Sequence, residues 1–298
     1  MYDDVHAPLV YMSSSPNNQQ QPVAVVTGSS SGIGLATSLA LSKNGYRTYA
    51  TMRNLAKRDS IQSVADKQHL SIRVVQLDVT DENSINDAIQ SILSESGRID
   101  LLVNNAGYAL TGAFEDIGID EIKAQYETNV FGVIRVTQAV LPIMRKQGSG
   151  RIINISSGAG RTGYPGGSAY VSSKFALEGL SESMAFEVEQ FGIKTVLVEP
   201  GFVRTNFADN IVIARKAQEP NSPYSQMMQK MSSNRGKVLE NASDANLVAD
   251  VVVEAATAKE PNLRYLAGKD VQQMVAAKKS MSDEEFHKMM KQGTMDEE

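Results

Sequence analysis

Three residues in the middle of this sequence have the side chains and the spacing of a proton-transfer site. Tyr170 is followed four residues later by Lys174, and Ser157 lies thirteen residues before Tyr170, after the apolar run 152–155. Residues four apart share one face of a helix, so the Lys174 ammonium can lie beside the phenol. A neighbouring cation favours the phenolate, and lowering the phenol pKa from ~10 by about three units requires roughly 4 kcal/mol. The Ser157 hydroxyl could hold a carbonyl or alcohol oxygen against Tyr170, which completes the outline of an acid–base site.

Spacing alone does not identify this site, because Tyr265 and Lys269 have the same spacing. That second pair spans Gly268, a poor helix former, and the residue thirteen before Tyr265 is Val252, which has no hydroxyl. The pair that begins at Tyr170 therefore has the setting that acid–base chemistry can use.

The composition limits the class of protein. The chain has 298 residues, 42% hydrophobic and 21% charged, and its formal net charge of -5 argues against general binding to nucleic acids or anionic membranes. It has no cysteine and only three scattered histidines, so we predict no disulfide and no metal site. Residues 1–21 are polar and lack the apolar core of a signal peptide, so we expect a flexible N-terminal leader. No apolar run reaches the ~18 residues of a membrane helix, so we expect a cytoplasmic protein without a membrane span.

Short apolar runs alternate with helical patterns after the leader. Near-continuous apolar strands separated by long periodic segments indicate a parallel sheet with helices on both faces. We therefore predict a single α/β domain over residues 22–268, with a doubly wound parallel sheet of about seven strands. The expected strands include residues 23–26, 47–50, 74–77, 101–103, 152–155 and 195–198, with 265–266 as a seventh. Ligands of such sheets bind at the carboxyl ends of the strands.

A glycine-rich turn follows the first expected strand and opens a helix near Ile33. Glycines allow the backbone to turn tightly and to approach a pyrophosphate, whose charge meets the helix N-terminus. Because the turn follows the first strand of a β-α-β unit, it favours a dinucleotide site over a purely geometric turn. The residues expected to contact the cofactor here are Gly28, Ser30, Ser31, Gly32, Ile33 and Gly34.

The end of the second expected strand bears on the choice of cofactor. An acid about 20 residues past the glycines usually binds a free ribose 2′-hydroxyl, whereas a 2′-phosphate needs a cation. Residues 49–58 contain no acid, and Arg53 lies just after the strand, so we predict NADP in preference to NAD. The simpler alternative is a solvent-exposed arginine without a ligand.

Polar residues follow the third and fourth expected strands and interrupt an apolar helix. Asp78 is placed for an adenine amino group, although it equally suits a turn or helix start near Thr80. Residues 104–107, Asn-Asn-Ala-Gly, combine polar side chains with a close backbone approach, or form a plain turn. Asn129 lies in an apolar helical stretch, where an amide is costly to bury unless it is hydrogen-bonded, and it could hold a water near Lys174.

In combination these motifs resemble the short-chain dehydrogenase/reductase family in its single-domain branch. Residues 27–34, TGSSSGIG, have the family's nucleotide-binding spacing, and residues 104–107 match its NNAG motif. Residues 199–205 resemble its nicotinamide-side segment. The family's catalytic tetrad falls on Asn129, Ser157, Tyr170 and Lys174. The cofactor-binding residues that the resemblance adds are Asn105, Ala106, Gly107, Tyr170, Lys174, Pro200, Gly201, Val203 and Thr205.

The resemblance implies a Rossmann-type fold and hydride transfer between a nicotinamide and a carbonyl or secondary alcohol. Tyr170 would be the general acid in reduction and the base in oxidation, and Ser157 would orient the substrate oxygen. Lys174 would lower the pKa of Tyr170 and bind the nicotinamide ribose, while Asn129 would hold a relay water. The family commonly forms homodimers or homotetramers through the helices that follow Tyr108 and Tyr170.

The C-terminal third of the chain is less informative. Residues 202–240 correspond to the family's variable substrate lid, and their methionines suit an apolar small-molecule substrate, although they could simply pack on the sheet. In the tail 269–298, Ser282 precedes three acids and a weak apolar stripe, which is typical of a helix N-terminus. We expect this tail to be a loosely attached helix.

Two other classes of protein remain open. A catalytically idle NADP-binding redox sensor would need the glycine-rich turn and Arg53 but not the tetrad. A sugar-nucleotide epimerase or dehydratase would share Tyr170 and Lys174, usually with a different glycine spacing and a longer C-terminal substrate domain. The intact tetrad and the glycine spacing favour the oxidoreductase.

Overall fold

The core of the fold is one parallel β-sheet. In the computed structural model, which describes residues 21–205, 211–240 and 242–295, seven strands lie in the order β11-β7-β6-β4-β1-β2-β3, and every neighbouring pair is parallel. The strands are β1 (Val23–Val26), β2 (Arg47–Met52), β3 (Ile72–Gln76), β4 (Leu101–Asn104), β6 (Gly150–Ile155), β7 (Ile193–Pro200) and β11 (Arg264–Ala267). Each expected apolar run coincides with or overlaps one of them. The predicted doubly wound α/β fold is confirmed, and residues 1–20 of the expected leader lie outside the described residues.

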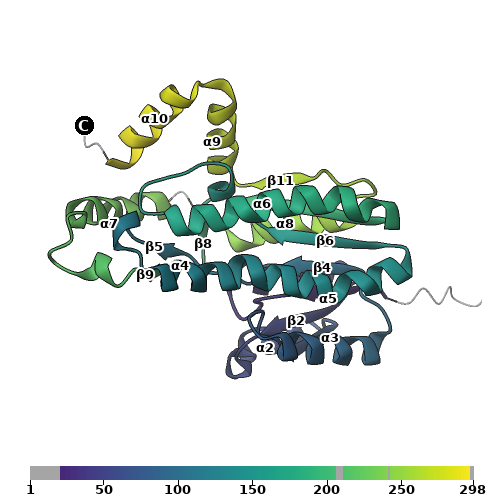
Figure 1. Ribbon diagram of the computed structural model, residues 1–298. Helices are drawn as coiled ribbons and strands as arrows, with labels where there is room; N and C mark the ends of the chain where they lie inside the picture. The colour runs from purple at the N-terminus through teal and green to yellow at the C-terminus, as the bar shows by residue number, and fades with distance from the viewer. Residues whose placement is uncertain (1–20, 206–210, 241, 296–298) are drawn as a thin grey trace, which may run out of the picture.

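Helices cover both faces of this sheet (Figure 1). One face carries α3 (Glu82–Ser96), α5 (Gly132–Gln147) and α6 (Ser168–Val188), and the other carries α1 (Gly32–Lys43), α2 (Asp59–Lys67) and α8 (Ala245–Thr257). The strand β1 contributes to both layers because successive side chains of a strand point to opposite faces. Val23 and Val25 pack with α3 and α5, whereas Ala24 and Val26 pack with α1 and α8.

The strand order reverses between β1 and β4, which are neighbours in the sheet. In doubly wound sheets ligands bind at this reversal, outside the carboxyl ends of the strands. The segments that leave β1, β4, β6 and β7 at this edge begin at residues 27, 105, 156 and 201. These are the segments that carry the glycine-rich turn, the NNAG motif, Ser157 and the nicotinamide-side residues.

A π-helical segment interrupts the apolar helical stretch that the sequence predicts around Asn129. It spans Glu127–Phe131, between α4 (Ile119–Tyr126) and α5, and contains Asn129. A π-helical turn carries one extra residue in the helix and is found frequently at functional sites. Nothing in the sequence pattern indicated it.

The C-terminal residues form helices above the carboxyl edge of the sheet (Figure 1). These are α7 (Ser225–Glu240), α9 (Lys269–Ser280) and α10 (Asp283–Met295), and α10 contacts both α7 and α9. The predicted start of α10 is present, since Ser282 Oγ accepts from Glu285 N at 3.2 Å and Ser282 N donates to Glu285 Oε2 at 2.8 Å. Phe286 is buried. The helix therefore contacts the protein through Phe286, while its acidic first turn is exposed.

Two short strand pairs complete the described elements near this edge. β5 (Leu110–Thr111) pairs with β9 (Val212–Ile213), and β8 (Val203–Arg204) pairs with β10 (Ser243–Asp244). They fasten the predicted lid region 202–240 to the rest of the fold at two points. Across the described residues no helix is both long and apolar enough to span a membrane.

Candidate active site

The structure brings Ser157 and Tyr170 together at the carboxyl end of β6. Ser157 lies two residues after β6 in extended conformation, and its Oγ accepts from Ala159 N at 3.1 Å, which caps the short 3-10 turn η4 (Gly158–Gly160). Tyr170 lies in the first turn of α6 and is buried, and the Ser157 side chain is near enough to its hydroxyl to lower its pKa. A substrate oxygen placed against one of these hydroxyls would be within reach of the other.

Lys174 lies one turn further along α6, beside the Tyr170 ring. Its Nζ is 5.7 Å from the centre of the Tyr170 ring and donates to the Ile155 carbonyl at 2.8 Å. Burial raises the pKa of Tyr170 to about 12, although the Ser157 hydrogen bond opposes this. Burial also lowers the pKa of Lys174 to about 8, against the Glu178 carboxylate. The expected lowering of the Tyr170 pKa by Lys174 is therefore not found in this structure, because desolvation of the phenolate raises that pKa and Ser157 is the group that opposes it.

Asn129 is held in place by the loop after β4. Its Oδ1 accepts from Tyr108 N at 3.1 Å, and its Nδ2 donates to Tyr108 O at 2.9 Å and to Ser173 Oγ at 3.3 Å. Both polar atoms of the buried amide are thus hydrogen-bonded, which offsets the free-energy cost of burying it. Ser173 directly precedes Lys174, so Asn129 lies next to the lysine along α6 without a hydrogen bond to it among those described.

The glycine-rich turn forms a cradle at the start of α1. Gly28 (φ +69°) and Gly32 (φ +57°) have left-handed backbone conformations that favour glycine, and a Cβ on Gly28 would lie 2.8 Å from the Ala106 Cα. A Cβ on Gly34 would collide with the Asn105 side chain. The N-cap, Ser31, makes no side-chain hydrogen bond to the first turn, which leaves the first N–H groups of α1 available to an anion. The cradle therefore fits a dinucleotide pyrophosphate.

The NNAG motif connects this cradle to the centre of the sheet. Asn105 Nδ2 donates to Thr27 O at 2.9 Å and to Gly28 O at 3.1 Å, and Thr27 Oγ1 accepts from Asn105 N and Ala106 N. Asn104, on β4, donates to Asn154 Oδ1 at 2.9 Å in the neighbouring strand. The alternative of a plain turn is therefore too simple, since the motif fixes the β4 edge against the glycine-rich turn.

The nicotinamide-side segment returns to the same cradle. A Cβ on Gly32 would lie 3.2 Å from the Thr205 Cβ, so the segment after β7 passes next to the start of α1. Asp270 of α9 fixes the segment from the other side, since its Oδ2 accepts from Phe202 N at 2.7 Å. Pro200, Gly201, Val203 and Thr205 thus lie on a path from the sheet to the cradle.

Arg53 and Asp78 lie at the outer end of the site. Arg53 follows β2, its side chain is exposed, and it takes part in none of the ion pairs among the described residues. Asp78 Oδ1 accepts from Thr80 N at 2.9 Å and from Thr80 Oγ1 at 2.8 Å. Asp78 therefore forms a turn with Thr80, which is one of the two roles that the sequence suggests for it. One of its carboxylate oxygens is used in this turn.

Methionines from distant parts of the chain lie close to the Ser157 segment. A Cβ on Gly158 would lie 2.7 Å from Met274 Cε of α9, and a Cβ on Gly166 would lie 2.8 Å from Met231 Cε of α7. Tyr164 also belongs here, because burial and the nearby Tyr170 raise its pKa, although 37% of the residue is exposed. Sequence reasoning missed Met274 and Tyr164, and neither has a motif or spacing that could have singled it out.

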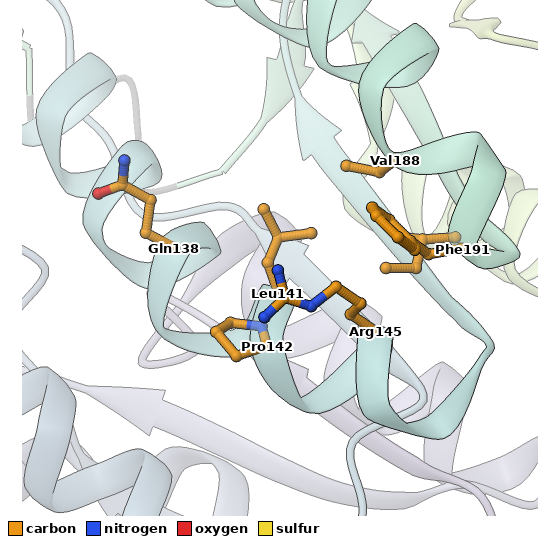
Figure 2. Close-up of a pocket in the computed structure, with 7 residues that line it drawn as sticks. Gln138, Leu141, Pro142, Arg145, Val188 and Phe191 are labelled. Carbon is orange, nitrogen blue, oxygen red and sulfur yellow. The ribbon is translucent and has the colours of Figure 1, made fainter.

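A hollow of about 160 Å³ lies away from these groups, on the outer surface between α5 and the end of α6 (Figure 2). Figure 2 shows α5 residues on one side of it and Val188 and Phe191 on the other. The Arg145 guanidinium lies 5.9 Å from the centre of the Phe191 ring at its rim. None of the expected catalytic residues lines it, so it is not a substrate site for the chemistry outlined above.

Known proteins share both the sequence and the fold. The family profile described as short chain dehydrogenase matches residues 22–216. The uncharacterized oxidoreductase YusZ of Bacillus subtilis is 42% identical, over 84% of this chain and 90% of its own length. A 3-ketodihydrosphingosine reductase of Bacteroides thetaiotaomicron is 36% identical, over 88% of this chain and 93% of its own. A short-chain dehydrogenase from Streptomyces avermitilis superimposes with a TM-score of 0.77 at 33% identity, covering 91% of this chain and 96% of that one.

Solved relatives hold nicotinamide cofactors. A metagenomic short-chain oxidoreductase in complex with NADP has a TM-score of 0.66 at 29% identity, over 82% of this chain and 96% of its own. A Burkholderia phymatum enzyme in complex with NAD has a TM-score of 0.77, over 90% of this chain and 95% of its own, and at 23% identity it shows the fold alone. The idle sensor and the epimerase gain no support from these relatives. The chain belongs to the short-chain dehydrogenase/reductase family and is an oxidoreductase that acts on CH–OH or carbonyl groups with a nicotinamide cofactor.

Proposed function

We propose that this protein is an NADP-dependent oxidoreductase that interconverts an apolar ketone and its secondary alcohol, with Tyr170 as the general acid and base. The observation that carries the proposal is that the Ser157 hydroxyl lies near the buried Tyr170 hydroxyl, next to the Lys174 ammonium and at the edge where the glycine cradle lies. Two hydroxyls beside a fixed cation can orient a substrate oxygen and exchange a proton with it.

The protein's part in such a reaction is to position the reactants and to move a proton. When bound, the nicotinamide supplies the hydride chemistry, and residues of the cradle and of the segment after β7 would hold it. Ser157 would orient the substrate oxygen, and Tyr170 would give that oxygen a proton in reduction and take it back in oxidation. Lys174 would bind the nicotinamide ribose, and Asn129 would hold a relay water beside α6. At neutral pH a phenol with a pKa of about 12 is protonated, which is the form that reduction requires.

The preference for NADP is supported by Arg53. A 2′-phosphate carries nearly two negative charges, and an exposed guanidinium that pairs with no carboxylate of the described residues can meet it with paired hydrogen bonds. Hydrogen bonds to charged groups contribute about 1.5–3 kcal/mol, which corresponds to roughly a ten- to hundredfold preference. Asp78 would remain available to the adenine only through the oxygen that Thr80 does not use.

An apolar substrate is supported by the residues near Ser157. Met228 and Met231 of α7 and Met274 of α9 approach the segment 158–166 from two different helices. Thioether side chains are flexible and suit an apolar ligand of irregular shape. The relative from Bacteroides thetaiotaomicron, a 3-ketodihydrosphingosine reductase, is named for a substrate of this chemical type.

We also propose that the chain forms a homodimer or homotetramer through α5 and α6. Phe186 of α6 is 79% exposed, and Phe175 of α6, Phe131 just before α5 and Phe191 just after α6 are also exposed. The hollow in Figure 2 lies on the same face. Large exposed apolar side chains on neighbouring helices are typical of a surface that a second copy covers.

The proposed function is tested by turnover. The purified protein is offered a panel of long-chain ketones, small ketones, aldehydes and secondary alcohols with NADPH, NADH or the oxidised cofactors, and nicotinamide absorbance is followed. We expect NADPH-dependent reduction that is fastest with an apolar ketone. Turnover confined to polar substrates would contradict the substrate class, and a preference for NADH would contradict the cofactor.

A further inference from the structure

A cluster of charged side chains joins α6 to the sheet. Arg264 of β11 places its Nε 3.0 Å from Glu178 Oε2 and 3.3 Å from Glu199 Oε1, and its Nη2 lies 3.1 Å from Glu182 Oε2. Arg161, which ends the turn η4, places Nη1 3.0 Å from Glu199 Oε1. Glu178 and Glu199 are buried, whereas the Glu182 side chain is 53% exposed. Buried charges persist in proteins when they are paired in this way.

The members of this cluster lie close in sequence to the proposed catalytic groups. Arg161 follows Ser157 by four residues, and Glu178 follows Lys174 by four residues on the same face of α6. Glu199 is the last residue before the Pro-Gly of the nicotinamide-side segment. The ion pairs therefore tie together the three segments that must stay in register for the reaction.

The charges of the cluster are balanced only when Lys174 is included. Three carboxylates face two guanidinium groups, and the buried Lys174 ammonium supplies the remaining positive charge. Burial lowers the pKa of Lys174, and the Glu178 carboxylate is the group that opposes this. Among the described residues, Glu178 Oε1 is buried and has no hydrogen-bond partner. Its other oxygen, Oε2, is paired with Arg264 Nε.

We propose that Glu178, held by Arg264, is a positioning residue for the reaction, because its buried carboxylate lies one helical turn from the buried Lys174 and favours the ammonium form beside Tyr170. The inference rests on the proposed function, which gives Lys174 its role. The other groups that bear on the lysine are Tyr170 on the same helix and Glu199 of β7 with its two arginine partners. Within the described part of the chain, Glu199 pairs with two arginines and Glu178 with Arg264 alone, so Glu178 is the carboxylate most able to act on Lys174.

A substrate-free titration tests this inference. Glu178→Gln keeps the shape of the side chain and removes its charge, and the titration of Lys174 is followed by ¹³C NMR of its ε-carbon in lysine-labelled protein. The signal is assigned by its loss in Lys174→Arg. We expect the Lys174 midpoint to fall by about one pH unit in Glu178→Gln, as is typical for loss of a neighbouring opposite charge. This readout needs no turnover, so it holds even if the proposed function fails.

Kinetics then test the link to the reaction. With an active ketone, the alkaline limb of kcat/KM for reduction should move to lower pH in Glu178→Gln by about the same amount as the NMR midpoint. The matched control is Glu182→Gln, which removes an exposed carboxylate from the same arginine, one turn further from Lys174, and should leave both midpoints unchanged. An equal shift in Glu182→Gln would overturn the assignment to Glu178.

A second variant covers the case in which Glu178→Gln does not fold. Arg264→Lys removes no charge but loses the planar fork that holds three carboxylates, so it should lower turnover and move the Lys174 midpoint from its value in the unmodified protein by less than one pH unit. Either folded variant, with circular dichroism and a thermal midpoint like those of the unmodified protein, decides the question. An unchanged Lys174 midpoint together with unchanged turnover would overturn the positioning role.

Discussion

The Lys174 ammonium lies 5.7 Å from the centre of the Tyr170 ring and gives its hydrogen bond to the Ile155 carbonyl, not to the phenol. Both groups are buried, and burial shifts both pKa values toward the neutral forms, to about 12 for Tyr170 and about 8 for Lys174. The pair is therefore arranged as a protonated phenol beside a lysine that can lose its charge at moderately alkaline pH.

This arrangement predicts how stability depends on pH. Between pH 8 and the ordinary lysine value of 10.5, the unfolded chain binds a proton at Lys174 that the folded chain does not, so stability rises with pH across that window. Each pKa unit corresponds to about 1.4 kcal/mol. Above pH 10 Tyr170 acts in the opposite sense, because its folded pKa is raised and the folded chain then binds more protons.

Urea unfolding of the unmodified protein and of Lys174→Met measures this effect. As pH rises from about 8 to about 10, the unfolding free energy of the unmodified protein should increase relative to that of Lys174→Met. A difference that stays constant would contradict the burial argument.

Tyr170→Phe should abolish nearly all turnover while cofactor binding is kept. Removing the proton donor should lower kcat by at least the 10²–10⁴-fold typical of general acid–base catalysis. The matched control is Tyr265→Phe, at the other Tyr-x-x-x-Lys pair, where the tyrosine lies on β11 and the lysine opens α9 after Gly268 (φ +128°). That variant should retain its turnover. Full activity in Tyr170→Phe would show that another group transfers the proton.

Arg53→Ala should raise the Kd for NADPH roughly ten- to a hundredfold and barely change that for NADH. Arg73→Ala is the control for charge, because Arg73 lies on β3, pairs with Glu95 and is remote from the carboxyl edge. Fluorescence titration with both cofactors measures the effect. Equal weakening of both cofactors would refute the role of Arg53.

A change of cofactor preference should be attempted at Arg53 and not at Met52. An acid at position 52 looks suitable in the sequence, but Met52 is 1% exposed and packs with Ala50, Ile61 and Ile72. Met52→Asp would bury a carboxylate without a partner, which destabilises the fold. Arg53→Asp places the acid on the surface, and we expect it to favour NADH without lowering the thermal midpoint.

Met274→Ala should weaken the binding of long apolar substrates selectively. Met274 Cε lies next to Gly158, and removing a well-packed apolar side chain of this size forfeits about 1.5–3 kcal/mol of burial, or roughly ten- to a hundredfold in KM. For a short ketone that does not reach α9, KM should stay the same. Met281→Ala, at a residue that is 39% exposed beyond α9, is the control. An equal loss with short and long ketones would indicate a structural effect and would count against the substrate site.

Phe186→Glu should dissociate the proposed oligomer. The side chain is 79% exposed on α6, and a charge there would be buried without a partner at the interface. Light scattering at micromolar concentration should give a dimer or tetramer for the unmodified protein and a smaller mass for the variant. Leu247→Glu, on α8 at the opposite face of the sheet, should leave the mass unchanged. A monomeric unmodified protein would disprove the proposal.

The amino-acid sequence by itself determined the strands, the cradle and the spacing of the proposed catalytic groups, because each of these depends on neighbours along the chain. An apolar run such as 23–26 forms a buried strand wherever the sheet places it, and left-handed turns at Gly28 and Gly32 depend on the absence of a side chain. Tyr170 and Lys174 share a face of α6 because they are four residues apart.

Only the tertiary structure decided the features that depend on distant residues. The pKa of Tyr170 rises instead of falling, because the whole fold excludes water from the phenol. Asn129, in the π-helical turn, bonds to Tyr108, 21 residues away, and Glu178 pairs with an arginine 86 residues away. Met274 reaches Gly158 from a helix that forms after the last strand. Such contacts follow no local period, so burial and charge at the site were settled by packing across the sheet and not by any motif.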